Sequence, residues 1–186
     1  MRRSNVVKTK IEFPVHRLEK NVPSDNNYKV RNFKIYLETS IFNTYFDEVR
    51  LERRFYTRKL FDDIEKGKYD AFVSQIVLRE LQRAEEPKRT AMLRLLNEYK
   101  IKEVKWEDAI DSLAIVYIQE GVVPQKRRLD ALHIAAATIH GLDIVVSYNC
   151  RHIARAKSFL LANAANKREG YKEILLHTPE EVLDVG

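Results

Sequence analysis

The chain has 186 residues and a mass of 21.9 kDa, which is about the size of one domain. Apolar residues make up 45% of the sequence and charged residues 32%, as is ordinary for a globular protein with a buried core. No apolar run approaches the roughly 20 residues that a membrane-spanning helix needs, and the first residues do not resemble a secretory signal. The single cysteine excludes an internal disulfide framework and a cysteine-based zinc site. We therefore expect a cytoplasmic protein without a membrane segment.

The basic excess of the chain is concentrated at its start. Lys and Arg number 33 and Asp and Glu 27, but residues 1–32 alone hold eight Lys or Arg and three Asp or Glu. Residues 33–186 hold 25 and 24, so this part is nearly neutral. We predict a basic N-terminal extension over 1–32, either a docking arm or a solvated tail, and one domain over 33–186. Net charge alone does not identify that domain as a nucleic-acid binder.

Short apolar runs alternate with amphipathic segments from residue 33 onward. In chain order, the pattern predicts a strand over 33–37, a helix from near Ile41 that Thr39 and Ser40 can cap, a helix over 50–66 and a strand over 69–73. Helices over 74–84 and 87–99 follow, then a strand over 101–104 and helices over 107–120 and 128–140. The chain ends with a strand over 143–147, a helix over 153–167, a strand over 173–177 and a short helix after Thr178.

The predicted strands lack the polar alternation of a half-exposed sheet. Apolar strands that alternate with helices are typical of a parallel sheet with both faces covered. The fold class predicted is therefore α/β, a three-layer α/β/α sandwich with a mainly parallel central sheet.

Four polar residues fall where such a sheet binds ligands, beyond the carboxyl ends of its strands. Glu38 directly follows the first strand, and Asn149 follows the strand over 143–147. Glu80 lies on the apolar side of its helix, and Asp130 opens a helix that is apolar almost all round. Three carboxylates on one rim need a cation, and oxygen ligands favour Mg²⁺ or Mn²⁺ over zinc.

Each of these residues also has a purely structural explanation. Glu38 could cap a helix or form an ion pair at the strand end, and Glu80 could pair with Arg79 or Arg83. Asp130 could interact with its helix dipole, and Asn149 could be a turn residue. His133, one helical turn after Asp130, is predicted to be a core residue.

Four segments carry a resemblance to a known family: residues 35–43 (IYLETSIFN), 74–80 (SQIVLRE), 128–136 (RLDALHIAA) and 144–153 (IVVSYNCRHI). In order and spacing they resemble the four acidic motifs of the PIN-domain ribonucleases, and the likeness covers about residues 33–183. The resemblance implies an acidic pocket at the carboxyl edge of the sheet and divalent-metal-dependent hydrolysis of RNA. Many single-domain members of this family resemble toxins of type II toxin–antitoxin pairs.

The resemblance assigns Glu38, Glu80 and Asp130 as metal ligands and catalytic residues, with Asn149 at the fourth catalytic position. The family usually has Asp at the first position and often at the fourth. These two departures leave open a catalytically weak or inactive PIN-like module that binds RNA or a protein partner.

Further residues are expected to support this site. Thr39, Ser40 and Ser147 could hold the ligands in place, and the candidates for contact with RNA are Arg128, Arg151 and His152. The partners implied are RNA and a cognate antitoxin that covers the acidic pocket. A homodimer is also plausible through an aromatic cluster, for which the alternative is packing in the core; the cluster comprises Phe42, Tyr45 and Phe46.

Overall fold

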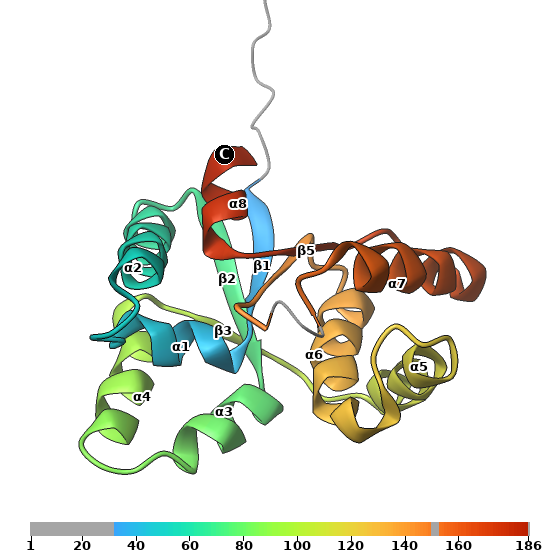
Figure 1. The fold of residues 1–186 in the computed structure, drawn as a ribbon, viewed down its shortest axis with the longest axis horizontal. Coiled ribbons are helices and arrows are strands. Elements are labelled where there is room, and N and C mark those ends of the chain that lie inside the picture. The colour runs from blue at the N-terminus through green and yellow to red at the C-terminus, as the bar shows by residue number, and fades with distance from the viewer. Residues whose placement is uncertain (1–31, 150–152, 186) are drawn as a thin grey trace, which may run out of the picture. The chain divides into compact units, whose positions relative to one another are not determined.

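The structure is a computed structural model that describes residues 32–149 and 153–185 (Figure 1). Residues 31–186 form one compact unit. The basic extension predicted over 1–32 lies outside the described residues except for Asn32, whose side-chain amide donates a hydrogen bond to the Gly67 carbonyl oxygen (2.6 Å).

The described residues build one sheet of five parallel strands in the order β3-β2-β1-β4-β5. The strands are β1 (Phe33–Leu37), β2 (Tyr69–Ser74), β3 (Lys102–Val104), β4 (Ile144–Val146) and β5 (Leu175–His177). Every strand runs parallel to its neighbours, and the α/β class and parallel sheet predicted from the sequence are confirmed.

The helices form one layer on each face of the sheet. The path from β1 through β2 to β3 moves one way across the sheet, and its right-handed crossovers place four helices on one face: α1 (Thr39–Tyr45), α2 (Leu51–Glu65), α3 (Gln75–Gln82) and α4 (Lys88–Glu98). The chain then returns past β1 to β4 and β5, so the next helices cover the other face (Figure 1). These are α5 (Asp108–Gln119), a 3₁₀ turn (Gln125–Arg127), α6 (Arg128–Ile139) and α7 (Ala156–Glu169), while the final α8 (Pro179–Val185) packs on α2.

The core lies on both sides of β1 and β4. Ile35, Tyr36 and Leu37 of β1 are fully buried, and every residue of α6 from 130 to 138 is buried. This helix is central, as its nearly continuous apolar sequence predicts. The aromatic cluster at α1 also packs inward: Phe42 is fully buried, and the Tyr45 ring lies edge-on to Phe61 with centroids 5.0 Å apart. The core alternative for these aromatics is therefore the one observed.

Some element ends differ from the prediction. The first helix begins at Thr39, two residues earlier than expected, because Glu38 is its N-cap and accepts a hydrogen bond from the Ser40 backbone N–H (3.1 Å). The last long helix begins at Ala156 because Ile153 N–H and Ala154 N–H both turn back to the Asn149 carbonyl oxygen. No helix within residues 32–149 and 153–185 is long and apolar enough to cross a membrane.

The sheet topology creates a crevice beyond the ends of β1 and β4. Connections leave these neighbouring strands toward opposite faces, which is the point where open α/β sheets bind ligands. The Glu38 backbone N–H donates to the Val146 carbonyl oxygen (3.0 Å) and extends the pairing to the last residue before this crevice.

Candidate metal site at the carboxyl edge of the sheet

Glu38 is fixed at the mouth of the crevice by three hydrogen bonds. The Ser40 backbone N–H (3.1 Å), the Ser40 hydroxyl and the Ser147 hydroxyl (2.9 Å) all donate to its Oε2. The residue is only 8% exposed, so these donors compensate for the desolvation of a charged group. Because all three bonds end on one oxygen, they leave Oε1 for another partner.

Glu80 is fixed in the same way from the opposite side of the crevice. It lies in the second turn of α3 and is half-buried. The Thr39 hydroxyl donates to its Oε2, and His133 Nε2 lies 3.2 Å from the same oxygen. Here too the bonds leave Oε1 for a further contact. The Glu38 and Glu80 carboxylates are thus each held through one oxygen, by donors from α1, from the residue after β4 and from α6.

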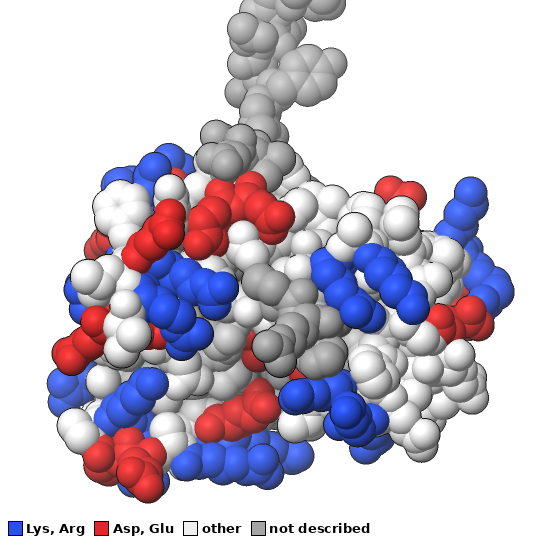
Figure 2. Space-filling view, in the orientation of Figure 1, with Lys and Arg blue, Asp and Glu red and all other residues white. Residues whose placement is uncertain are grey.

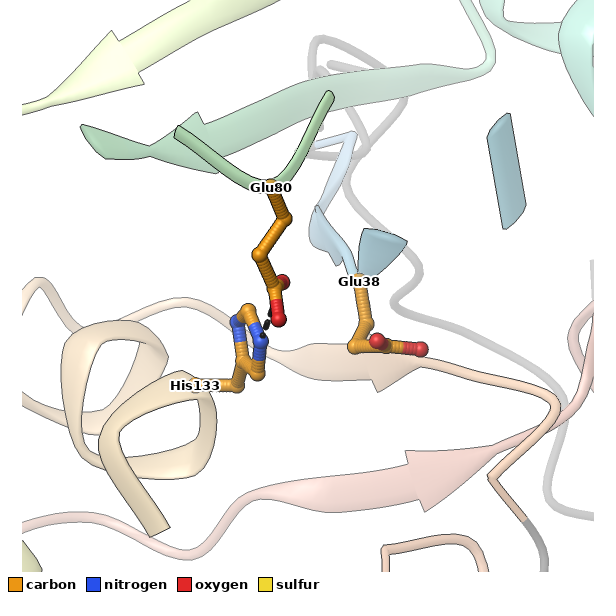
Figure 3. Close-up of side chains that lie close together, drawn as sticks. All are labelled: Glu38, Glu80 and His133. Carbon is orange, nitrogen blue, oxygen red and sulfur yellow. Dashed lines mark ion pairs between the residues drawn. The ribbon is translucent and has the colours of Figure 1, made fainter. Parts of the chain in front are cut away.

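His133 connects Glu80 to the core. Its side chain is buried in α6, and its Nδ1 lies 2.8 Å from the Tyr36 hydroxyl, which itself lies 2.7 Å from the Ser74 hydroxyl. Figure 3 shows Glu80 and His133 pointing toward each other from different helices, with Glu38 beside them. Since a carboxylate only accepts hydrogen bonds, Nε2 carries the proton in this contact.

The charges of the site shift the pKa values of this pair. Burial by itself lowers the pKa of His133, but the hydrogen bond to Glu80 and the negative charges of Glu38, Glu80 and Asp130 outweigh it and raise that pKa. For Glu80, burial acts to raise the pKa, while hydrogen bonds from His133 and Thr39 lower it below its ordinary value. Glu80 is therefore ionised at neutral pH.

The possible ligand atoms of Glu38, Glu80 and His133 lie within 4.8 Å of one another, which is close enough for one metal ion. Carboxylate oxygens suit Mg²⁺ and Mn²⁺, whereas imidazole is preferred by metals such as zinc, iron and copper. Both nitrogens of His133 already have partners, whereas each glutamate has an oxygen left by the bonds described above. The donor set thus fits a divalent cation held chiefly by carboxylates.

The remaining predicted catalytic residues border this group. Asp130 is buried in the first turn of α6, one turn before His133. The negative charge of Asp130 raises the pKa of His133. Asn149 follows β4, is half-buried, and donates its backbone N–H to the Ser147 hydroxyl (2.9 Å). The trio within 4.8 Å includes Glu38 and Glu80 from the predicted ligand set and adds His133 in place of Asp130.

Three small polar residues support the two glutamates. Thr39 donates to Glu80, and Ser40 and Ser147 donate to Glu38. Ser40 also accepts a hydrogen bond from the Tyr148 backbone N–H (2.9 Å), so the segments after β1 and β4 are tied together next to Glu38. All three residues predicted to hold the ligands contact one of them.

A cleft of about 380 Å³ opens beside Glu80. It lies between α3, the segment before α5, and α6, and it is lined by Gln75, Ile76, Arg79, Glu80, Arg83, Trp106, Asp111, Arg128, Leu129 and Leu132. Arg128, predicted to contact substrate, lies here and forms an ion pair with Asp111 (2.6 Å). The other two predicted contacts, Arg151 and His152, lie outside the described residues.

Sequence reasoning did not assign two parts of this region. His133 was predicted to be a core residue and is buried, but it also contacts Glu80. Its position three residues after Asp130, on the same helical face, was the signal that it could belong to the site. The cleft residues Trp106 and Arg83 lie outside the four motif segments, and Arg79, in the segment over 74–80, was considered only as an ion-pair partner of Glu80. Only the packing of α3, α5 and α6 brings them together.

Comparison with protein-family models and with curated proteins finds no match for this chain. The functional argument therefore depends on the four sequence segments and on the geometry of the site.

Proposed function

We propose that the protein is a divalent-metal-dependent ribonuclease of the PIN type. The observation that carries the proposal is the arrangement of Glu38 and Glu80 at the switch point of the sheet, each held through Oε2. Such fixed carboxylates are ready to bind a cation without reorganising. RNA as the substrate follows from the resemblance of the four segments to the PIN motifs.

The proposed ligands are Glu38, Glu80 and Asp130, with Mg²⁺ or Mn²⁺ as the cation. His133 is assigned to orienting Glu80, because binding a metal through Nε2 would break its contact with that carboxylate. A bound cation would activate an attacking water and offset the charge that develops on the phosphate. Asn149, which follows β4 at the same rim, supplies an amide that can donate to a phosphate oxygen.

The protein's own residues determine where the substrate phosphate sits. Buried carboxylates repel a phosphate unless cation charge lies between them, so the acids define the metal position and nearby donors define the phosphate position. The Ser40 and Ser147 hydroxyls are already committed to Glu38. Asn149 and the arginines beside Glu80 are therefore the groups proposed to contact RNA.

The test is cleavage of a single-stranded RNA by purified protein with added Mg²⁺ or Mn²⁺. We expect metal-dependent cleavage that falls at least about 100-fold in the double variant Glu80→Gln with Asp130→Asn. The matched control is Glu103→Gln with Glu107→Gln, which also removes two carboxylates but at exposed positions. Far-ultraviolet circular dichroism checks that all variants remain folded.

Two outcomes would count against the nuclease. The first is a wild-type protein that cleaves no RNA with either metal, and the second is equal cleavage by the site variant and the control. RNA binding without cleavage would favour the alternative of an inactive PIN-like module. The substituted first and fourth motif positions, Glu38 and Asn149, are the observation behind that alternative.

We further propose that the protein acts in the cytoplasm as the toxin of a toxin–antitoxin pair. An antitoxin segment that presents Arg or Lys would complement the Glu38–Glu80 site and block it. Purification together with the product of a neighbouring small gene, and loss of RNA cleavage in that complex, is the expected result. Cleavage that the neighbouring product does not affect would separate the nuclease proposal from the toxin proposal.

A further inference from the structure

We propose that the cleft beside Glu80 binds one nucleotide of a single-stranded RNA, with the base on Trp106 and the backbone phosphate on Arg79 and Arg83. This inference rests on the proposed function, because it makes the cleft the site for a nucleotide next to the one that is cleaved. It assigns a substrate subsite in which Trp106 and Arg83 lie outside the four motif segments, while Arg79 belongs to the segment over 74–80.

The position and size of the cleft fit that role. Glu80 is shared between the candidate metal site and the cleft wall, so a strand whose phosphate lies at the metal site continues directly into the cleft. Its volume of about 380 Å³ falls within the range of about 300–1,000 Å³ typical of small-ligand sites. The space is therefore suited to a single nucleotide and not to a duplex.

The charge of the cleft favours a phosphate. Three arginines line it, and Arg83 directly follows the last residue of α3, three positions after Glu80. Arg128 is paired with Asp111, and Arg79 donates a hydrogen bond to the neutral Gln75 (3.1 Å). Within residues 32–149 and 153–185, neither Arg79 nor Arg83 forms a close ion pair, although the charge of Arg83 acts on Glu80 and helps to lower its pKa. Both guanidinium groups can therefore make the planar, bidentate contact that suits phosphate.

Figure 2 shows basic side chains gathered at the same end of the molecule, over α3 and over the start of α6, on either side of acidic ones. This distribution contrasts with the nearly neutral charge of residues 33–186 as a whole. A local basic rim beside an acidic metal site is what a nuclease needs, because the acids alone would repel the RNA backbone.

Trp106 supplies a surface for the base. It is half-buried, and its indole Nε1–H donates to Asp111 Oδ2 (3.2 Å), while Asp111 Oδ1 accepts from Arg128 (2.6 Å). Asp111 thus holds both the indole and a guanidinium in place on the cleft wall. Aromatic rings and arginine planes are the usual platforms for unstacked RNA bases.

Apolar side chains complete the base-binding part. Leu129 is 45% exposed at the start of α6, and Leu132 and Ile76 lie deeper in the same wall. Large exposed apolar side chains next to a tryptophan bind the face of a flat ligand better than they bind a free ion. A base with an attached phosphate therefore matches the cleft, since one part needs the apolar wall and the other the arginines.

Trp106 is the single tryptophan of the chain, so its fluorescence reports on this cleft alone. The experiment titrates the full-length protein in EDTA with a short single-stranded RNA and follows both tryptophan fluorescence and RNA anisotropy. We expect saturable quenching of Trp106 at the RNA concentration at which anisotropy rises. An abasic strand of the same length should bind more weakly and quench little.

Two variants make the test specific. Arg83→Gln, at an exposed position, should weaken RNA binding about threefold to tenfold and reduce its salt dependence. Trp106→Leu should weaken it about tenfold, within the range measured for loss of one stacked base. Lys59→Gln, which removes one exposed positive charge on α2, is the control and should bind as the wild type does.

The inference is overturned if RNA binds without quenching Trp106, or if Arg83→Gln and Trp106→Leu bind RNA as tightly as the control. It is also overturned if a cognate protein partner, but not RNA, quenches Trp106. Cleavage in Mn²⁺ separates this inference from the proposed function. Quenching of Trp106 by RNA without RNA cleavage would support the subsite and contradict the nuclease proposal. RNA cleavage with an unchanged KM in both Arg83→Gln and Trp106→Leu would support the nuclease proposal and contradict the subsite.

Discussion

His133 Nε2 lies 3.2 Å from Glu80 Oε2, although the two residues belong to helices that cover opposite faces of the sheet. The contact is possible because α3 and α6 both reach the carboxyl edge, where no strand separates them (Figure 1). It joins the two helical layers beside the candidate metal site. The stability of the layers and the geometry of the site are therefore coupled through the His133–Glu80 pair.

The Tyr36 hydroxyl supports this pair, so its removal should destabilise the protein. Tyr36→Phe deletes a buried hydroxyl that lies 2.7 Å from Ser74 Oγ and 2.8 Å from His133 Nδ1, leaving both without that partner. The expected loss is about 1–3 kcal/mol in the free energy of unfolding, measured by urea denaturation. Tyr45→Phe is the control, since its hydroxyl contacts Tyr99 near the surface (3.1 Å). Equal losses in the two variants would show that the buried network contributes nothing specific.

Divalent metal should stabilise the folded protein. Binding to the native state alone at 100 times the dissociation constant contributes about 2.7 kcal/mol, which is a clear rise in melting temperature. Glu38→Gln keeps an oxygen that can accept from Ser147 but removes the charge, so the Mn²⁺-dependent rise should disappear. Glu103→Gln removes an exposed charge from β3 and should leave the rise intact. If neither Mg²⁺ nor Mn²⁺ changes the melting temperature of the wild-type protein, this result would argue against a metal ion at this site.

The Ser147 hydroxyl should increase the affinity of the site for metal although it is not itself a ligand. Its buried hydroxyl donates to Glu38 Oε2 (2.9 Å) and accepts from the Asn149 backbone N–H (2.9 Å). Ser147→Ala removes one of the three hydrogen bonds that hold the Glu38 carboxylate and leaves the Asn149 N–H without this acceptor. We expect the Mn²⁺ concentration for half-maximal stabilisation to rise about 10- to 100-fold. Ser112→Ala, at an exposed position on α5, is the matched control; a shift of the same size there would contradict the assignment.

The layers and strand direction were predictable because they follow from local apolar patterns. All of β4 and the last three residues of β1, 35–37, are buried, and this burial appears in the sequence as short apolar runs. The ends of α1 and α7 were less predictable, because side-chain and turn hydrogen bonds at Glu38 and Asn149 determine them. Such bonds depend on geometry that no periodicity encodes.

The residues of the candidate site also fall into two groups, those that the local sequence indicated and those that only the fold brings together. Glu38 directly follows a strand, so its strand position indicated it, whereas Thr39 and Ser40 were first predicted as helix caps and then as supporting residues through the resemblance. His133 was visible only as a polar residue in an apolar helix, for which core packing is the more frequent explanation. Trp106 and Arg83 lie on separate segments that meet only through the packing of α3, α5 and α6. Long-range contacts of that kind cannot be inferred from one sequence without its fold.

The loop between α1 and α2 should make stability depend on acidic pH. Asp47 Oδ1 accepts from the backbone N–H groups of Val49 (2.9 Å) and Arg50 (2.8 Å), and Oδ2 accepts from the Arg50 guanidinium (2.6 Å). These backbone bonds first, and then the hydrogen bond and the charge of the Arg50 guanidinium, lower the pKa of Asp47 to about 2. A lowered pKa in the folded state stabilises the protein above the pKa of the unfolded chain, near 3.9, and this contribution is lost as pH falls toward 2.

Asp47→Asn should therefore melt at a lower temperature than the wild type at pH 6, and the difference should shrink steadily below pH 4. Thermal unfolding measured in steps from pH 6 to pH 2.5 follows both proteins through this window. Glu48→Gln removes the exposed neighbouring carboxylate and controls for the loss of one charge from the loop. A difference between Asp47→Asn and the wild type that stays constant down to pH 2.5 would mean that the ionised carboxylate does not hold the loop, because only its protonation can remove the effect in that range.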